Sequence, residues 1–152
     1  MLLSNRFDQA IRKLYEAFHS HSLQPECACQ CAVGTISDGK DQWKHFSDDH
    51  GSHRLNYVGK VHEAFGRRIN GYLPSELLQI EVAFLKGCGY SLPLRHNGRK
   101  PNDPSDKNVQ FQGMEAAIEV LCKLDGKSNI MDYTQLFDPT VEVEANCKEG
   151  IL

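Results

Sequence analysis

Three cysteines alternate along one short stretch of the chain, and two histidines follow further along it. The cysteines are Cys27, Cys29 and Cys31, and the histidines are His50 and His53. Thiolates are soft ligands that bind zinc, copper(I) and iron–sulfur clusters, and imidazole suits zinc as well. If the loop that carries the histidines lies near the cysteines, the two groups would form one Cys/His site. The sequence therefore predicts a candidate site for zinc or another soft metal at these five residues.

The spacing of the cysteines leaves a second interpretation open. Structural zinc sites most often begin with C-x₂-C, whereas this run reads C-x-C, and no second C-x-x-C pair completes a four-cysteine site. Cysteine also packs as a small hydrophobic residue. In that interpretation Cys29, Val33 and Ile36 form the apolar stripe of a short core helix, and the histidines lie near the start of the next helix.

Composition places the chain among ordinary globular proteins. It has 152 residues, of which 40% are hydrophobic and 24% charged, with a formal net charge of −3. This charge balance leaves no excess of basic residues for binding nucleic acid. Because no apolar run has the length of a signal peptide or a membrane span, we expect a cytoplasmic protein with no membrane segment. In that compartment thiols stay reduced, which argues against a disulfide framework.

The hydrophobic pattern predicts one helix after another. Apolar residues recur at helical spacing from Phe7 to Phe18, which is typical of an amphipathic helix. The remaining expected elements are a short helix from Pro25, a helical turn at 43–46, helices at 55–69, from Pro74 to Gly87, at 111–121 and at 130–137, and a Pro-rich loop at 91–108. The expected fold is an all-α, compact single-domain bundle of five or six helices. The domain would span 1–138, followed by a flexible tail at 139–152.

Familiar enzyme motifs are missing from the sequence. It contains no G-x-G-x-x-G, P-loop, G-x-S-x-G or H-E-x-x-H. Glu76 and Glu81 are five residues apart on one predicted helix, so we do not expect them to converge as paired carboxylates. These observations favour a protein that is not an enzyme.

Several short segments make the chain resemble a family of small bacterial proteins. The matching segments are Cys31-Ala-Val-Gly, Asn56-Tyr-Val-Gly, Gly71-Tyr-Leu-Pro-Ser-Glu-Leu-Leu-Gln-Ile-Glu, Phe84-Leu-Lys-Gly-Cys-Gly-Tyr-Ser-Leu-Pro-Leu and Leu121-Cys-Lys-Leu-Asp-Gly. The resemblance covers most of residues 7–137. Members of this family often carry the name of the flavin- and NADH-binding subunit of sodium-translocating NADH-quinone reductase.

That name implies electron transfer through flavin and a plant-type iron–sulfur centre. Such a centre needs C-x₄-C-x₂-C and a distant fourth cysteine, a spacing that this sequence does not contain. The pattern of the chain also offers no nucleotide-binding strand–loop–helix unit. We therefore do not expect flavin or a plant-type iron–sulfur cluster.

Three functional hypotheses remain. The first is a non-enzymatic interaction or regulatory module with a protein partner, which would use the face from Trp43 to Tyr57 or the 91–108 loop. The second is a metal-binding or redox protein that uses the cysteine run with the nearby histidines. The third, the electron-transfer role in an NADH-quinone reductase that the resemblance implies, has the weakest support from the residues. The sequence does not determine the oligomeric state.

Overall fold

The computed structural model describes residues 2–92, 94 and 97–126, with the side chains described from Arg6 onward. Within these residues the protein is helical and contains no strand, so the predicted all-α fold is confirmed. An isolated bridge joins Ile69 to Tyr72. The elements are α1 (Leu2–His19), α2 (Ala32–Ile36), the 3₁₀-helix η1 (Gln42–Phe46), α3 (Tyr57–Ala64), α4 (Pro74–Cys88) and α5 (Lys107–Leu124).

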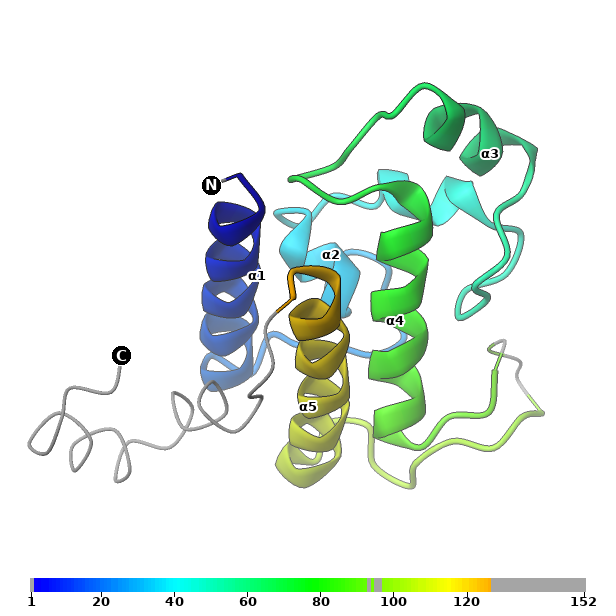
Figure 1. Cartoon of the computed structure of the whole chain (residues 1–152). Coiled ribbons are helices and arrows are strands. Elements are labelled where there is room, and N and C mark those ends of the chain that lie inside the picture. Colours follow the sequence, from blue (N-terminus) through cyan, green and yellow to red (C-terminus); the bar gives the residue numbers. More distant parts are fainter. Residues whose placement is uncertain (1, 93, 95–96, 127–152) are drawn as a thin grey trace, which may run out of the picture.

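Three long helices form the body of the molecule. Figure 1 shows α1, α5 and α4 standing side by side, with the short α2 behind them and α3 lying across the end of α4. The helices α4 and α5 approach closely because glycine lies in their interface. A Cβ on Gly113 of α5 would stand 2.3 Å from the sulfur of Cys88 and 2.8 Å from the carbonyl oxygen of Phe84. The backbone of α5 therefore lies directly against α4 at Gly113.

One continuous apolar core lies between these helices. The predicted stripe of α1 is buried, and the inner faces of α4 and α5 complete the core. Fully buried members include Phe7, Leu14, Leu77, Ile80, Phe84, Met114, Ile118 and Leu121. None of the described helices is both long and apolar enough to cross a membrane.

A buried arginine ties the N-terminal helix to the rest of the body. The guanidinium of Arg6 pairs with a carboxylate oxygen of Asp125 at 2.6 Å and with one of Glu76 at 3.0 Å. It also stacks on the ring of Tyr72, 4.3 Å from its centroid. The pair partners Arg6 and Asp125 have side chains that are 5% and 1% exposed. Replacing one of these charged residues leaves its partner as an uncompensated buried charge, which strongly destabilises the fold.

The second helix starts later than predicted. Residues 25–31 form turns, and the helix occupies Ala32–Ile36 with Cys31 as its N-cap. The expected start at Pro25 was wrong because Cys31 caps the helix through its own sulfur, which accepts the N–H of Gly34 at 3.5 Å. Gly34 lies inside α2, where an added Cβ would meet the carbonyl oxygen of Ala28 at 2.2 Å.

The third helix is shorter than predicted, whereas the fourth begins where expected. The helix α3 ends at Ala64, and Gly66, with φ of +68°, lies beyond it, where an added Cβ would meet no atom within 4 Å. Gly59 does mark a close approach, with an added Cβ 2.4 Å from the carbonyl oxygen of Phe46. For α4, Pro74 is the first residue, and the Glu76 carboxylate accepts the N–H of Leu73 at 2.9 Å.

Two predictions fall on residues that the structure does not describe. These are the short sixth helix at 130–137 and the tail at 139–152.

The Pro-rich segment connects α4 to α5, and α5 begins at Lys107 with Asp106 as its N-cap.

Candidate metal centre

Three side chains from separate parts of the chain converge beside α2. The sulfur of Cys31, a ring nitrogen of His50 and a carboxylate oxygen of Glu81 all lie within 4.8 Å of one another. Cys31 is fully buried, Glu81 is 1% exposed, and the His50 side chain is 21% exposed. Among the described residues, these three side chains form the group of His, Cys, Asp and Glu residues that could hold a metal ion.

The turn before α2 holds Cys31 in place. The Cys31 N–H donates to the carbonyl of Cys27 at 2.8 Å, and its sulfur lies 3.7 Å from the carbonyl oxygen of Ala28. Burial raises the pKa of the Cys31 thiol well above its usual range, and the nearby Glu81 carboxylate raises it further. The N–H of Gly34 acts in the opposite direction but does not outweigh burial. Without a metal, the side chain is therefore a neutral thiol at neutral pH.

Glu81 lies on the apolar side of α4 and uses both carboxylate oxygens. Its Oε1 accepts the backbone N–H of Val33 in α2 at 3.2 Å, and its Oε2 lies 2.9 Å from Nε2 of His50. The bond to Val33 fixes the rotation of the carboxylate. As a result Oε2 points at His50 and at the space beside the Cys31 sulfur. This is the arrangement by which outer hydrogen bonds orient a metal ligand.

His50 lies in the loop between η1 and α3, and its neighbours fix its ring. Its backbone carbonyl accepts the N–H of Leu94 at 2.9 Å. The ring meets that of Trp43 edge-on at a centroid distance of 5.5 Å, and the indole N–H of Trp43 donates to the carbonyl of Ala28 at 2.9 Å. The turn around Cys31 and the loop around His50 are therefore joined through Trp43.

A pocket opens beside His50, and neither Cys31 nor Glu81 is part of its wall. Its volume is about 560 Å³, and His50 and Trp43 form part of its wall. The residues that line it are Ala28, Trp43, Lys44, His45, Ser47, Asp48, His50, Asn56 and Val58. Most of this wall belongs to the segment from Trp43 to Tyr57 that the sequence analysis singled out as a face for interaction.

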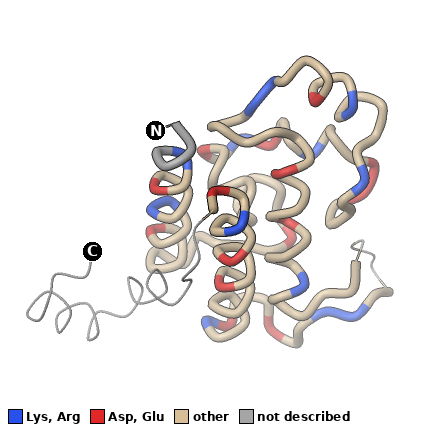
Figure 2. Tube along the Cα trace, viewed as in Figure 1, with Lys and Arg blue, Asp and Glu red and all other residues tan. Residues whose placement is uncertain are grey.

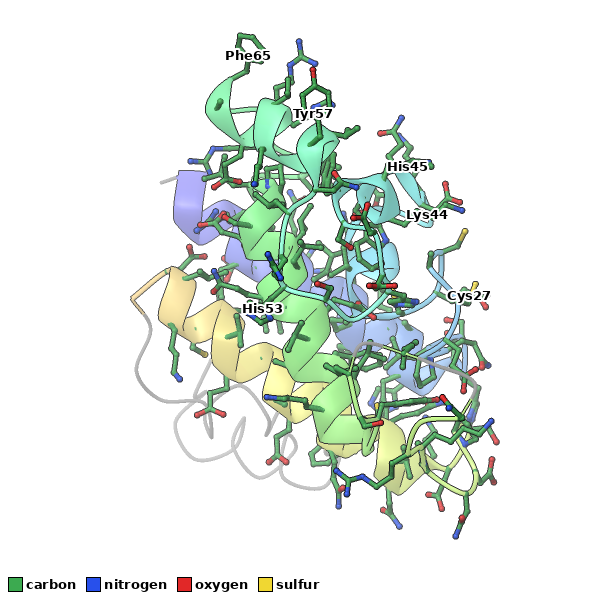
Figure 3. The ribbon with its side chains drawn as sticks, turned by 90° about the vertical axis from the view of Figure 1, so that its right-hand side faces the viewer. Cys27, Lys44, His45, His53, Tyr57 and Phe65 are labelled. Carbon is green, nitrogen blue, oxygen red and sulfur yellow. The ribbon has the colours of Figure 1, made fainter. Side chains whose placement is uncertain are left out.

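The structure brings together two of the five predicted metal ligands. Cys31 and His50 meet at the cluster, whereas Cys27 and Cys29 remain half-exposed on the turn and His53 is exposed. Figure 3 shows Cys27 and His53 on the outside of the molecule, away from each other. The five described cysteines form no disulfide with one another. Cys29 is half-exposed, and Val33 and Ile36 enter the core without it, so the packing alternative was wrong for Cys29.

Sequence reasoning missed Glu81, although its pattern contained a signal. Leu77, Glu81 and Leu85 follow one another at steps of four, so the carboxylate occupies a position on the apolar stripe of α4. A charged residue is almost never fully buried unless it is paired or bound. A glutamate in such a stripe therefore indicates a partner inside the protein.

The same three residue types also occur in cysteine-nucleophile triads. In such a triad the acid orients the histidine and the histidine activates the thiol. The nucleophile must then be a thiolate that reaches a substrate. Cys31 is fully buried, and burial raises the pKa of its thiol. The burial of Cys31 therefore keeps its sulfur away from any substrate in solution.

Compared with protein-family models, with curated proteins and with solved structures, the chain matches none.

Proposed function

We propose that the protein is a metal-binding protein whose centre is formed by Cys31, His50 and Glu81, with zinc as the metal. The observation that carries this proposal is the convergence of three potential ligand atoms, one from each residue, within 4.8 Å. They come from positions 31, 50 and 81, so tertiary structure is needed to assemble them.

The distances suit a tetrahedral ion. Zinc bonds of about 2.3 Å to sulfur and about 2.0–2.1 Å to nitrogen and oxygen place neighbouring ligand atoms about 3.3–3.6 Å apart. Here all three potential ligand atoms lie within 4.8 Å of one another, and Nε2 of His50 lies 2.9 Å from Oε2 of Glu81. A zinc ion would replace the proton that these two atoms share, with a small outward movement of each.

The donor set and the surroundings favour zinc over harder cations. Magnesium and calcium prefer shells of oxygen, whereas thiolate and imidazole select zinc and related transition metals. A thiolate and a carboxylate also neutralise the two positive charges of the ion. That balance matters because Cys31 and Glu81 are buried, and a buried charge is costly unless it is compensated.

Zinc titration of single variants tests the proposal. We expect one zinc per chain by elemental mass spectrometry, and a loss of at least about 100-fold in affinity for Cys31→Ser, His50→Gln and Glu81→Gln. Cys29→Ser and His53→Gln serve as controls and should bind like the wild type. Retention of zinc by Cys31→Ser, together with its loss from Cys29→Ser, would refute the site.

A second candidate function is a protein-interaction surface on α3. Among the described residues, the large apolar side chains that stand exposed are Tyr57, Phe65 and Val58, at 81%, 71% and 41%. Lys and Arg outnumber Asp and Glu in the segment 54–68, which contains α3 (Figure 2). The basic residues of this segment are Arg54, Lys60, Arg67 and Arg68, against the single acidic Glu63.

This combination fits an acidic protein segment with apolar anchors. Tyrosine, phenylalanine and arginine are enriched at the centres of protein interfaces, and the guanidinium of Arg67 lies over the ring of Phe65 at 5.5 Å. Selection from a random peptide library should enrich peptides that combine Asp or Glu with apolar residues. The double variant Tyr57→Ser/Phe65→Ser should lose that selection. Enrichment of basic peptides, or equal binding by the double variant, would contradict this candidate.

A further inference from the structure

We infer that the acidic segment 138–152 of this same chain docks on the exposed apolar and basic surface of α3, and that it covers this surface in the free protein. The surface consists of Tyr57, Val58, Lys60, Phe65, Arg67 and Arg68. This inference rests on the interaction surface proposed above as the second candidate function, and it names the segment that occupies that surface.

The apolar side chains of α3 form one exposed face. Phe65 lies eight positions after Tyr57 and seven after Val58, so the three side chains share one side of the helix. In Figure 3 the labelled side chains of Tyr57 and Phe65 both project outward from α3. The guanidinium of Arg67 lies over the ring of Phe65, which places a positive charge beside the apolar face. A partner for this face therefore combines apolar side chains with carboxylates.

The positive charge of this surface is not neutralised by its own acidic residue. Glu63 is the one acidic residue of the segment 54–68, and its carboxylate accepts the N–H and the hydroxyl of Ser75 at 3.0 and 2.7 Å. The ion pairs that form among the described residues do not include Arg54, Lys60 or Arg67. These cations can therefore pair with carboxylates from elsewhere.

The end of α5 lies beside the basic turn that follows α3. Asp125, the C-cap of α5, pairs with the guanidinium of Arg6, which also donates to the carbonyl oxygen of Gly71 at 2.7 Å. The guanidinium of Arg68 donates to that same carbonyl oxygen at 2.9 Å. Figure 1 shows the end of α5 and the loop from α3 to α4 at the same end of the molecule. The chain that continues from α5 therefore starts next to the surface.

The segment 138–152 has the composition that this surface requires, and it is close enough to reach it. It contains four acidic residues and one lysine, and Val141-Glu-Val-Glu places two valines next to two glutamates. At about 3.3 Å per residue, the connecting residues 127–137 span at most about 36 Å, whereas α3 is only about 12 Å long. Tethering gives such a segment an effective concentration on the order of mM. A contact that is weak between separate molecules therefore still covers the surface.

NMR spectra of the full chain test the contact. Glu142→Lys/Glu144→Lys should release the segment and shift the backbone amide signals of residues 57–68. Glu16→Lys/Glu119→Lys is a matched control, because it changes the net charge equally at exposed positions of α1 and α5, and it should leave those signals in place. Unchanged signals at 57–68 in Glu142→Lys/Glu144→Lys, or equal shifts in the control, would overturn the inference. Signals at 57–68 that depend on protein concentration would place the segment on a second copy of the chain and would also overturn it.

A binding experiment separates this inference from the surface on which it rests. A labelled peptide with the sequence of residues 138–146 should bind the Glu142→Lys/Glu144→Lys chain at least about threefold more tightly than the wild type, because the tethered segment no longer competes. Adding Tyr57→Ser/Phe65→Ser to that chain should remove the binding. Equal binding to the wild type and to Glu142→Lys/Glu144→Lys would overturn the docked segment and leave the surface standing. Failure of this peptide, with library peptides still bound at α3, would also overturn the docked segment alone, and failure of both would overturn the surface as well.

Discussion

Replacing Glu81 with glutamine should abolish most of the stabilisation that zinc gives to the fold. Glutamine keeps the size of the side chain and an oxygen that can accept the N–H of Val33, so the bond now made by Oε1 at 3.2 Å survives. What the variant removes is the anionic oxygen that faces His50 at 2.9 Å. The zinc-free variant should therefore fold, and its difference from the wild type should appear mainly when zinc is added.

The expected size follows from binding linkage. With free zinc at about 100 times its Kd, binding stabilises the wild type by about 2.7 kcal/mol. For a chain of this length that raises Tm by about 5–11 °C. Altering groups that merely support a ligand costs about 10–100-fold in metal affinity, so losing a ligand should cost at least about 100-fold. At the same zinc concentration the variant would gain about 0.4 kcal/mol, or about 1–2 °C.

Thermal unfolding followed by circular dichroism, with and without zinc, measures this difference. Glu119→Gln is a matched control, because Glu119 is exposed on α5 and should leave the zinc-induced shift unchanged. A zinc-induced shift in Glu81→Gln equal to that of the wild type would refute the role of Glu81 as a ligand.

Three further predictions concern the scaffold, and urea unfolding measures each of them. Arg6→Leu should lower the free energy of unfolding by about 3–5 kcal/mol, because it strands the buried carboxylate of Asp125; a loss below about 1 kcal/mol, well under the range for a broken buried pair, would contradict this. Gly113→Ala should cost about 1–3 kcal/mol, because the new methyl group meets α4 at 2.3 Å, and unchanged stability would show that the helices separate freely. The hydrogen bond from Lys13 lowers the pKa of Asp38, so this exposed pair stabilises the fold above the ordinary aspartate pKa of about 3.9 and loses that effect as pH falls. Asp38→Asn should therefore lower the free energy of unfolding by at most about 1 kcal/mol at pH 7 and leave it unchanged at pH 2. Asn also tolerates the φ of +65° at this position, so the backbone adds no further cost. An equal loss at both pH values would show that the charge of Asp38 is not its cause.

The long helices were predictable because each one buries a regular stripe. Phe7, Leu14 and Phe18 in α1 repeat at helical spacing, and Pro74 marks the start of α4 by a local rule. The short α2 was misplaced because local signals compete there. Pro25 favours a helix start, but the cap that forms belongs to Cys31, whose sulfur accepts the N–H of Gly34. No local sequence rule predicts that the cap at Cys31, rather than Pro25, sets the start of α2.

The candidate site was predictable only in part, because its residues meet through tertiary packing. Their residue types identified Cys31 and His50 as candidate metal ligands. The alternating spacing of the three cysteines suggested that all three bind the same metal. The turn at 27–31 separates them, with Cys31 directed into the core and Cys27 and Cys29 left half-exposed. Glu81 escaped notice because it was weighed only against Glu76 on its own helix. Its actual partners, His50 and Val33, lie on other elements.

X-ray absorption spectroscopy of the zinc-loaded protein tests the central claim most directly, because it counts the sulfur atoms bound to the metal. The proposed centre predicts one sulfur at about 2.3 Å, from Cys31, and nitrogen or oxygen ligands at about 2.0–2.2 Å. The sulfur should disappear from the spectrum of Cys31→Ser and persist in Cys27→Ser and Cys29→Ser. Two or three sulfur ligands in the wild type would instead place the metal at the surface cysteines and contradict the centre at Cys31, His50 and Glu81.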